Sequence, residues 1–314
     1  YLGSFLIMSL SSCLKFVLRT VKIMFQVVGS LAALGLIGIY SFQNKLVYPS
    51  FANNGRKHVD TPNKYGMPYL AIDLTTKDNV VIKGFVLRHN PLSANYKDKT
   101  IVMLSPNAGN IGHYLPTVKI FFREFHYNVV IVSYRGYGYS EGEPSEKGIK
   151  LDAEAILNYL IIDEQFKRSS IILYGRSIGG AVGIYMAYIN QVLNTDKNFN
   201  ISAIILENTF LSIHKVIPFI FPLLKYCSFL CHDKWPSEEY VEHISKEIPV
   251  LFLSGLKDEI VPSGHMEELH KLSLSDKKVF IKFKNGYHND TNCQPDYWKH
   301  VYKFIEEDVV NRNL

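Results

Sequence analysis

The chain has 314 residues, of which 47% are hydrophobic and 20% are charged, which is enough to bury the core of one large domain or two small ones. The net charge of +5 comes from lysines and arginines scattered along the chain, and this distribution argues against nucleic-acid binding. No repeat of about 20–50 residues is visible, which excludes a solenoid or a propeller.

The N-terminal part has the character of a membrane anchor. Residues 23–44 contain no charged side chain, and about 20 apolar residues span a bilayer core as a helix. Basic residues at 15–22 favour a cytoplasmic N-terminus, with the rest of the chain in the lumen or outside the cell. A cleavable signal peptide is the alternative, but its apolar region would be shorter and end in small residues. We expect a retained signal anchor within residues 1–45 and a linker at 46–68.

From residue 69 onward, apolar runs alternate with helical patterns. The sequence predicts strands at 69–75, 79–87, 100–105, 128–134, 170–174, 202–207, 250–255 and 278–283, and helices at 113–125, 146–163, 177–193, 263–273 and 296–307. A hairpin signal joins the first two strands, which are expected to be antiparallel. The others are apolar on both faces, which favours a parallel sheet covered by helices. We therefore predict an α/β domain with an eight-stranded, mostly parallel sheet over residues 69–314.

Residues 211–245 break this alternation, because they are apolar and contain three prolines. We expect a helical cap at the carboxyl edge of the sheet, where such folds bind ligands; an ordinary core helix is the alternative. Cys227, Cys231 and His232 could form part of a metal site. Further ligands at zinc spacing are absent, which favours apolar cysteines and no metal.

The segment Gly175–Gly180 reads GRSIGG and matches the G-x-S-x-G pattern. An apolar strand precedes it and a helical pattern follows, so the turn must be sharp enough to strain the serine, and side chains in place of the glycines would clash. Ser177 is the predicted nucleophile. The N–H of Ile178 lies at a helix N-terminus, where an anion is stabilised, and is a predicted oxyanion donor. A serine in an ordinary strand-to-helix turn is the alternative.

A serine nucleophile needs a base to take its proton and an acid to orient that base. In this architecture the acid and then the histidine follow the serine along the chain. Asp258, just past the strand at 250–254, is the preferred acid, with Glu259 and Glu207 as competitors. His288 follows the last strand and is the predicted base.

The second oxyanion donor is expected in the loop after the strand at 100–104. Asn107 is the first residue there able to aim an N–H inward, because Pro106 has none. A simple turn is the alternative, since proline, asparagine and glycine are common in turns.

Six segments together resemble the bud-emergence-type α/β-hydrolases from about residue 69 to 307: SPNAGNIGHY, VSYRGYGYSEGEPSEKG, LYGRSIGGA, ILENTFLSI, GLKDEIVP and YHND. The resemblance implies the α/β-hydrolase fold and a serine-hydrolase triad of Ser177, Asp258 and His288. It also implies membrane attachment, often at the endoplasmic reticulum.

One departure from that family lies in the oxyanion loop. Relatives usually carry His-Gly before Asn-Ala-Gly-Asn, where this chain has Ser105 and Pro106; the Asn107 donor can survive this change. The Tyr134–Gly138 segment, YRGYG, is a family hallmark. It lacks the third glycine of a phosphate-binding loop, so we interpret it as structural support for the site.

The sequence therefore predicts a membrane-anchored serine hydrolase that cleaves ester or thioester bonds through an acyl-enzyme, without a metal or organic cofactor. The apolar cap and the anchor suggest a lipid-like or acylated-protein substrate. A serine peptidase of the same fold and an inactive scaffold in membrane organisation or cell polarity are the alternatives. Asn200 and Asn289 begin glycosylation sequons; the second adjoins His288 and is expected to stay unmodified.

Overall fold

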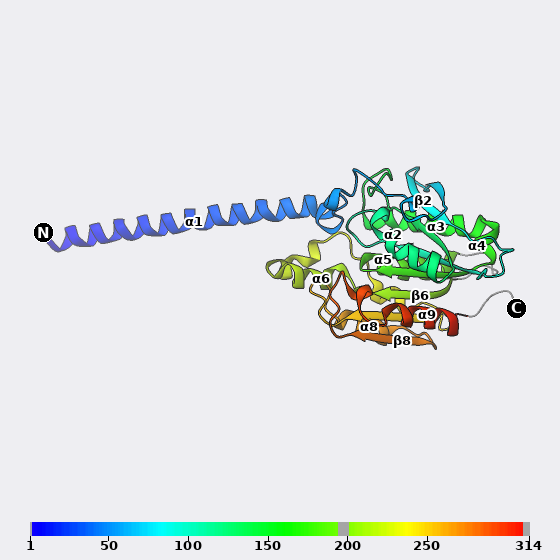
Figure 1. Ribbon diagram of the computed structural model, residues 1–314. Coiled ribbons are helices and arrows are strands. Elements are labelled where there is room, and N and C mark those ends of the chain that lie inside the picture. The colour runs from blue at the N-terminus through cyan, green and yellow to red at the C-terminus, as the bar shows by residue number, and fades with distance from the viewer. Residues whose placement is uncertain (1, 194–200, 310–314) are drawn as a thin grey trace. The chain divides into compact units, whose positions relative to one another are not determined.

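The computed structural model describes residues 2–193 and 201–309, so the sequon at Asn200 lies outside the described residues. The chain divides into two compact units, Tyr1–Leu46 and Val47–Leu314. The eight-stranded sheet and the helices that cover it lie in the second unit (Figure 1).

Helix α1 (Leu2–Val47) belongs to the first unit except for its last residue, Val47. Most of its large apolar side chains from Leu14 onward are exposed, including Phe25 and Leu34. The helix is long and apolar enough to cross a membrane, with Leu14–Asn54 as the candidate span. The anchor expected at residues 23–44 lies inside this span.

One sheet is formed by β1 (Leu70–Thr75), β2 (Val81–Leu87), β3 (Lys99–Leu104), β4 (Asn128–Val132), β5 (Ser170–Arg176), β6 (Ile201–Glu207), β7 (Val250–Gly255) and β8 (Lys278–Phe283). The strand order is β1-β2-β4-β3-β5-β6-β7-β8. Strand β2 is antiparallel to β1 and β4, and the remaining pairs are parallel. The predicted eight-stranded, mostly parallel sheet is confirmed.

The turn of the first hairpin is longer than the sequence predicts. Strand β2 begins at Val81 instead of residue 79, because Asn79 has a positive φ of 61° and belongs to the turn. Asn79 N–H donates to the Thr76 carbonyl at 2.9 Å, and Thr76 N–H donates to the Val80 carbonyl at 3.0 Å. Asparagine tolerates the left-handed region better than most residues.

The connecting helices are α2 (Leu115–Lys119), α3 (Glu146–Ile162), α4 (Glu164–Arg168), α5 (Ile178–Leu193), α8 (Gly264–Leu272) and α9 (Tyr297–Glu307). The single helix predicted at 113–125 is instead three short segments: η3 (Ile111–Tyr114), α2 and the π-helical η4 (Ile120–Glu124). Pro116 has no N–H to donate, which accounts for the break between η3 and α2.

Helices cover both faces of the sheet, and each face has its own hydrophobic core (Figure 1). Side chains alternate between the two faces along a strand. On one face, Val102, Leu173 and Phe252 share a cluster with residues of α3, α5 and α8. On the other face, Ile101 and Ile172 share a cluster with residues of α2, η4 and α9. Burial on both faces explains why the central strands are almost continuously apolar.

The stretch at 46–68, expected to be a linker, belongs from Val47 onward to the second unit. It contains the short helices η1 (Ala52–Asn54) and η2 (Pro62–Tyr65). Tyr48, Val59 and Met67 are buried in the cores of that unit. Its high content of proline, asparagine and glycine therefore marks irregular packed structure.

The insertion expected at 211–245 lies between β6 and β7. It consists of α6 (Ile213–Ile220), the 3-10 helix η5 (Pro222–Leu230) and α7 (Ser237–Val241). Pro218 inside α6 and Pro222 at the start of η5 keep these segments short, because proline interrupts the helical hydrogen-bond ladder. We call residues 211–245 the cap.

Candidate active site

Ser177 occupies the turn between β5 and α5 and has a positive φ of 55°. A Cβ atom on Gly175 would lie 2.2 Å from the Gly179 carbonyl oxygen, and one on Gly179 would lie 2.1 Å from the Leu104 carbonyl oxygen. Both distances are far inside van der Waals contact with backbone. The glycines of the G-x-S-x-G pattern are therefore required for α5 to begin directly against the sheet, as predicted.

The backbone of Ser177 is fixed from strand β6. Its N–H donates to the Glu207 carbonyl at 2.9 Å, and its carbonyl accepts from the Thr209 hydroxyl at 2.7 Å. These two bonds hold a conformation that a non-glycine residue adopts only when its surroundings enforce it.

Three of the predicted site residues, Ser177, His288 and Asp258, form a continuous series of hydrogen bonds, which we call the row. His288 Nε2 lies 3.1 Å from Ser177 Oγ, and His288 Nδ1 lies 2.8 Å from Asp258 Oδ2. All three side chains are nearly buried. Asp258 Oδ1 also accepts the backbone N–H groups of Ile260 at 2.9 Å and Val261 at 2.7 Å, which fixes the orientation of the carboxylate.

The two competing acids are engaged elsewhere. Glu259 Oε2 accepts the backbone N–H of His288 at 3.1 Å and so contacts the loop and not the ring. Glu207 Oε2 accepts the hydroxyls of Tyr174 at 2.6 Å and Tyr297 at 2.8 Å on one face of the sheet. The geometry therefore selects Asp258 as the partner of the imidazole.

Asn208 is a site residue that the sequence analysis missed. Its side chain donates to Tyr287 O at 3.2 Å, His288 O at 3.3 Å and Thr291 Oγ1 at 2.9 Å, and accepts Gly255 N–H at 2.8 Å. It thus ties the end of β7 to the loop that carries the imidazole. An asparagine after a strand looks like an ordinary turn residue, and its buried position is visible only in three dimensions.

The first turn of α5 and the end of β3 are in direct contact, since Gly179 has no room for a Cβ against Leu104 and Ser105. Ile178 is the first residue of α5, so its N–H is among those without a carbonyl partner in the helix. Asn107 follows two residues after Ser105 in the loop after β3. The fold thus brings the segments of both predicted oxyanion donors to the nucleophile turn.

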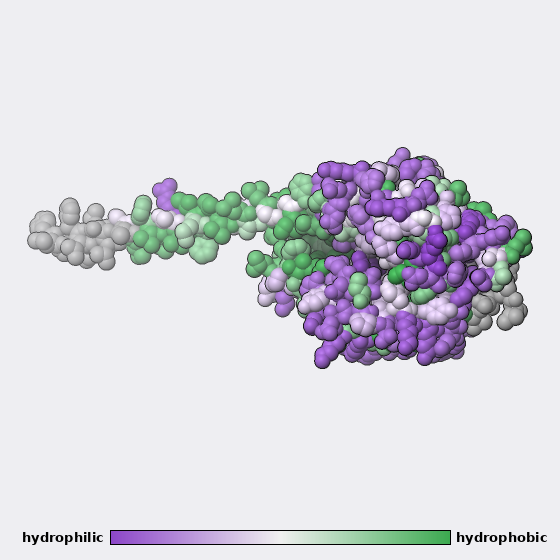
Figure 2. Space-filling model, in the orientation of Figure 1, coloured by the Kyte–Doolittle hydropathy of each residue, from purple (hydrophilic) through white to green (hydrophobic). Residues whose placement is uncertain are grey.

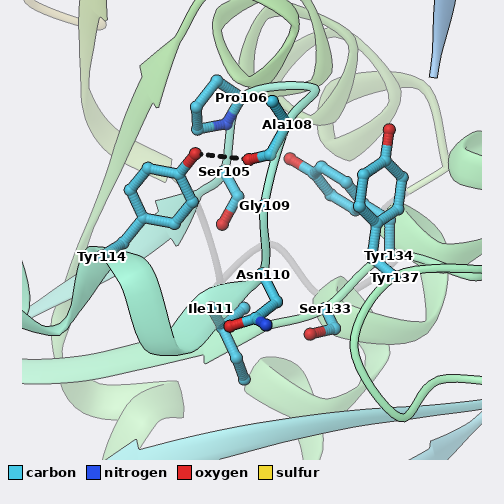
Figure 3. A pocket seen from close by; sticks show the side chains of 10 residues that line it. All are labelled: Ser105, Pro106, Ala108, Gly109, Asn110, Ile111, Tyr114, Ser133, Tyr134 and Tyr137. Atoms are coloured by element: carbon cyan, nitrogen blue, oxygen red, sulfur yellow. Dashed lines mark hydrogen bonds between the residues drawn. The ribbon is translucent and has the colours of Figure 1, made fainter. Parts of the chain in front are cut away.

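Tyrosines support this loop from both sides (Figure 3). Tyr114 donates to Ala108 O at 2.7 Å, and Tyr137 donates to Asn107 O at 2.9 Å. A cavity of about 10 Å³ lies behind the loop, where Ser105 Oγ and Tyr134 OH are buried without a hydrogen-bond partner. A space of this size holds a single water molecule and no substrate.

Arg135 anchors the YRGYG segment that supplies Tyr137. Its Nε donates to Asp152 Oδ1 at 2.9 Å, and its Nη1 donates to Asp78 Oδ2 at 2.7 Å. Burial raises the pKa of Asp152 to about 6, while the arginine acts in the opposite direction. Hydrogen bonds from Arg135 lower the pKa of Asp78. The segment thus holds Tyr137 in place against the loop that follows β3.

Arg176, which precedes Ser177, contacts Tyr114 of η3 and the loop that carries His288. Its guanidinium lies 5.7 Å from the Tyr114 ring centroid, and its Nη1 donates to Asn289 O at 3.5 Å. It pairs in register with Glu207 on β6, so a half-buried cation and a buried carboxylate lie on adjacent strands. Such opposite charges offset part of each other's desolvation cost.

The cysteine pair of the cap shows no metal-site geometry. The Cys231 thiol donates to Asp233 O at 3.3 Å, and burial raises its pKa to about 11, so it carries its proton near neutral pH. Among the described residues, no group of three or more histidine, cysteine or acidic side chains could hold a metal ion.

Comparisons with known proteins agree with this architecture. Residues 99–226 match the family model described as alpha/beta hydrolase fold. The chain is 45% identical over 282 residues to the uncharacterized membrane protein YNL320W of Saccharomyces cerevisiae, covering 89% of this chain and 95% of that one. It is 41% identical over 284 residues to protein bem46 of Schizosaccharomyces pombe, covering 90% and 91%.

Among solved structures, the Pyrococcus furiosus esterase Pf2001 superposes with a TM-score of 0.64 at 20% identity, covering 82% of this chain and all of that one. At this identity the likeness shows the fold alone. The identity to the two yeast proteins, over nearly their whole lengths, shows the family. The chain belongs to the bud-emergence-type family of α/β-hydrolase-fold proteins.

Proposed function

We propose that this protein is a membrane-anchored serine hydrolase that cleaves carboxylic ester or thioester bonds. The observation that carries the proposal is the row from Ser177 Oγ through the His288 imidazole to Asp258, with distances of 3.1 and 2.8 Å. A nucleophile, a base and an orienting acid in hydrogen-bond reach of one another are the requirements for acyl transfer through serine.

In the acylation step, Ser177 Oγ attacks the acyl carbon while His288 Nε2 takes the hydroxyl proton. Asp258 keeps the other ring nitrogen protonated and stabilises the imidazolium that forms. The N–H groups of Ile178 and Asn107 stabilise the tetrahedral oxyanion. The imidazolium then gives its proton to the departing alcohol or thiol, and the acyl group remains on Ser177.

In the deacylation step, water replaces the departed alcohol or thiol. His288 Nε2 takes a proton from the water as it attacks the acyl-enzyme carbonyl, and the same two N–H groups stabilise the second oxyanion. Collapse of that intermediate breaks the bond to Ser177 Oγ, which recovers the proton from the imidazolium. The carboxylic acid leaves, and each step balances without a metal or cofactor.

A lipid-like or acylated-protein substrate fits the apolar surroundings of the site. The cap lies between β6 and β7, next to the strand ends that carry the row, and many of its side chains are apolar. Helix α1 has the length and composition of a membrane span, and a close relative is named a membrane protein. An enzyme held at a bilayer meets long-chain substrates there.

A fluorophosphonate probe tests the proposed nucleophile, because it reacts only with an activated serine. Wild type and Ser212→Ala are expected to be labelled, and Ser177→Ala is not. Ser212 is a matched control, since both serines are 6% exposed. Absence of labelling in the folded wild-type protein would instead favour the inactive scaffold.

Matched substrates then test the bond type and the substrate class. An oxoester, a thioester and an amide with the same acyl chain separate the esterase from the peptidase, because only a peptidase is expected to hydrolyse the amide as well as the esters. Long-chain and short-chain esters are compared with and without lipid bilayer. Equal rates on short soluble esters, with no gain from membrane, would contradict the lipid-like substrate.

The family resemblance also leads us to place the protein in the endoplasmic reticulum or another endomembrane. Fractionation of cells expressing the full chain tests this placement. Asn289 is exposed beside His288, so a glycan there would obstruct the row; mass spectrometry is expected to find it unmodified.

A further inference from the structure

The cap carries an exposed apolar surface. Large side chains on α6, on η5 and at the residue between them are solvent-exposed: Phe219, Ile220, Phe221, Leu223, Tyr226 and Phe229. We call these six residues the cap patch. Leu223 is 94% exposed. Figure 2 shows hydrophobic residues gathered where Figure 1 draws α6. A cluster of this kind marks an interaction surface, whereas single exposed apolar residues do not.

The charges of this segment suit a lipid surface. Residues 208–232 contain no aspartate or glutamate. Lys225 is exposed within the cap patch, 6.0 Å from the Tyr226 ring centroid. Lys215 on α6 is paired with Glu238 of α7. A segment of aromatic and aliphatic side chains that contains lysine and no acidic residue has the composition of segments that lie in the headgroup region of anionic bilayers.

The base of the cap is fixed next to the residue at which the chain leaves the apolar helix. Tyr48 directly follows Val47, the last residue of α1. Its hydroxyl donates to Asp233 Oδ2 at 2.6 Å and accepts from Trp235 Nε1 at 2.8 Å. All three side chains are buried. We call these contacts of Tyr48 with Asp233 and Trp235 the Tyr48 clamp. Since α1 is the candidate membrane span, the clamp is only a short distance along the chain from the end of that span.

We propose that the cap patch inserts into the headgroup region of the bilayer that anchors α1. The bilayer is the occupant that fits, because the patch is apolar, lacks acidic residues and belongs to the segment clamped to the membrane-proximal residue. This contact is separate from the proposed hydrolysis and does not depend on it. It gives the domain a second attachment, which restricts its rotation and turns the cap toward lipid.

Tryptophan fluorescence in the full-length protein tests the insertion. Leu223→Trp is compared with Leu92→Trp, in nanodiscs that hold one protein each. Leu92 is a matched control, because it is 92% exposed and lies in the loop before β3, at the opposite edge of the sheet from the cap. Lipids brominated near the headgroup are expected to reduce the added emission of Leu223→Trp roughly two-fold and to leave that of Leu92→Trp unchanged.

A second variant guards against an effect of the new tryptophan itself. Brominated lipid is also expected to quench the added tryptophan emission of Tyr226→Trp. Combining this variant with Leu223→Asp and Phe229→Asp is expected to abolish the quenching, because carboxylates are excluded from the bilayer. Equal quenching at positions 223 and 92 would overturn the proposal. So would blue-shifted emission at 223 that brominated lipid does not quench, since protein would then cover the patch.

Discussion

Replacing Asp258 by asparagine is expected to trap the imidazole in the wrong tautomer. Asp258 Oδ1 accepts two backbone N–H groups, from Ile260 at 2.9 Å and Val261 at 2.7 Å. The amide oxygen of asparagine must take that position, because an amide NH2 there would face two donors. The NH2 group then points at His288 Nδ1, which becomes an acceptor, and the proton moves to Nε2, where it blocks proton transfer from Ser177.

The size of the effect follows from these contacts. Productive catalysis requires the flipped amide, whose oxygen would accept from His288 Nδ1. That flip would leave two buried donors unsatisfied, at about 1–3 kcal/mol each, so the productive orientation is disfavoured by at least ~2 kcal/mol, or about 30-fold. Loss of the carboxylate also removes about 4 kcal/mol of attraction to the imidazolium, taking an effective dielectric of about 20 and a separation near 4 Å. Together these terms predict a fall in kcat/KM of about 10⁴-fold.

The assay measures kcat/KM on a chromogenic ester together with the rate of fluorophosphonate labelling. Glu259→Gln is the matched control, because its side chain can still accept the backbone N–H of His288, and it is expected to stay within about ten-fold of wild type. Thermal unfolding checks that Asp258→Asn is folded. Asp258→Asn activity within ten-fold of wild type would refute the reasoning; loss of activity in Glu207→Gln instead would identify Glu207 as the acid.

Two further predictions concern folding. Gly179→Ala is expected to lose more than about 4 kcal/mol of stability, because its Cβ would lie 2.1 Å from the Leu104 carbonyl oxygen. Gly183→Ala should unfold near the wild-type Tm, because its Cβ would meet only side chains, Leu104 at 3.2 Å and Leu173 at 3.9 Å. Burial lowers the pKa of His265, whose Nδ1 accepts Leu211 N–H at 3.2 Å. The folded state thus favours the neutral ring, and its contribution is present above about pH 6.5 and lost as pH falls. The Tm of wild type should fall more than that of His265→Gln on acidification; equal falls would count against this origin.

Much of the site could be predicted because the chain order and strand ends constrain it. The nucleophile and the histidine each follow a recognisable apolar strand, and parallel strands bring their carboxyl ends to one edge. The acid remained ambiguous from sequence, since Glu207 also ends a strand. Side-chain direction decides it: Glu207 faces Tyr174 and Tyr297, while Asp258 faces the imidazole.

The missed features depend on contacts between distant parts of the chain. Tyr48 and Trp235 are separated by 187 residues and form a buried hydrogen bond, which no local pattern encodes. The sequence predicts a linker after Val47 for the same reason. The irregular backbone of these residues is stabilised by contacts with distant parts of the same domain. Asn208 acts through loops more than 40 residues further along.

The placement of the cap has a consequence for how this scaffold can diversify. The exposed part of the cap lies between Leu211, whose N–H donates to His265 Nδ1, and the pair Asp233 and Trp235, which Tyr48 holds. Between these two fixed ends, we expect residues 212–232 to be exchangeable without moving the strand ends that carry the proposed chemistry, provided that Asp233 and Trp235 are kept. Chimeras that exchange these residues between relatives are expected to change substrate preference while the row of Ser177, His288 and Asp258 is retained.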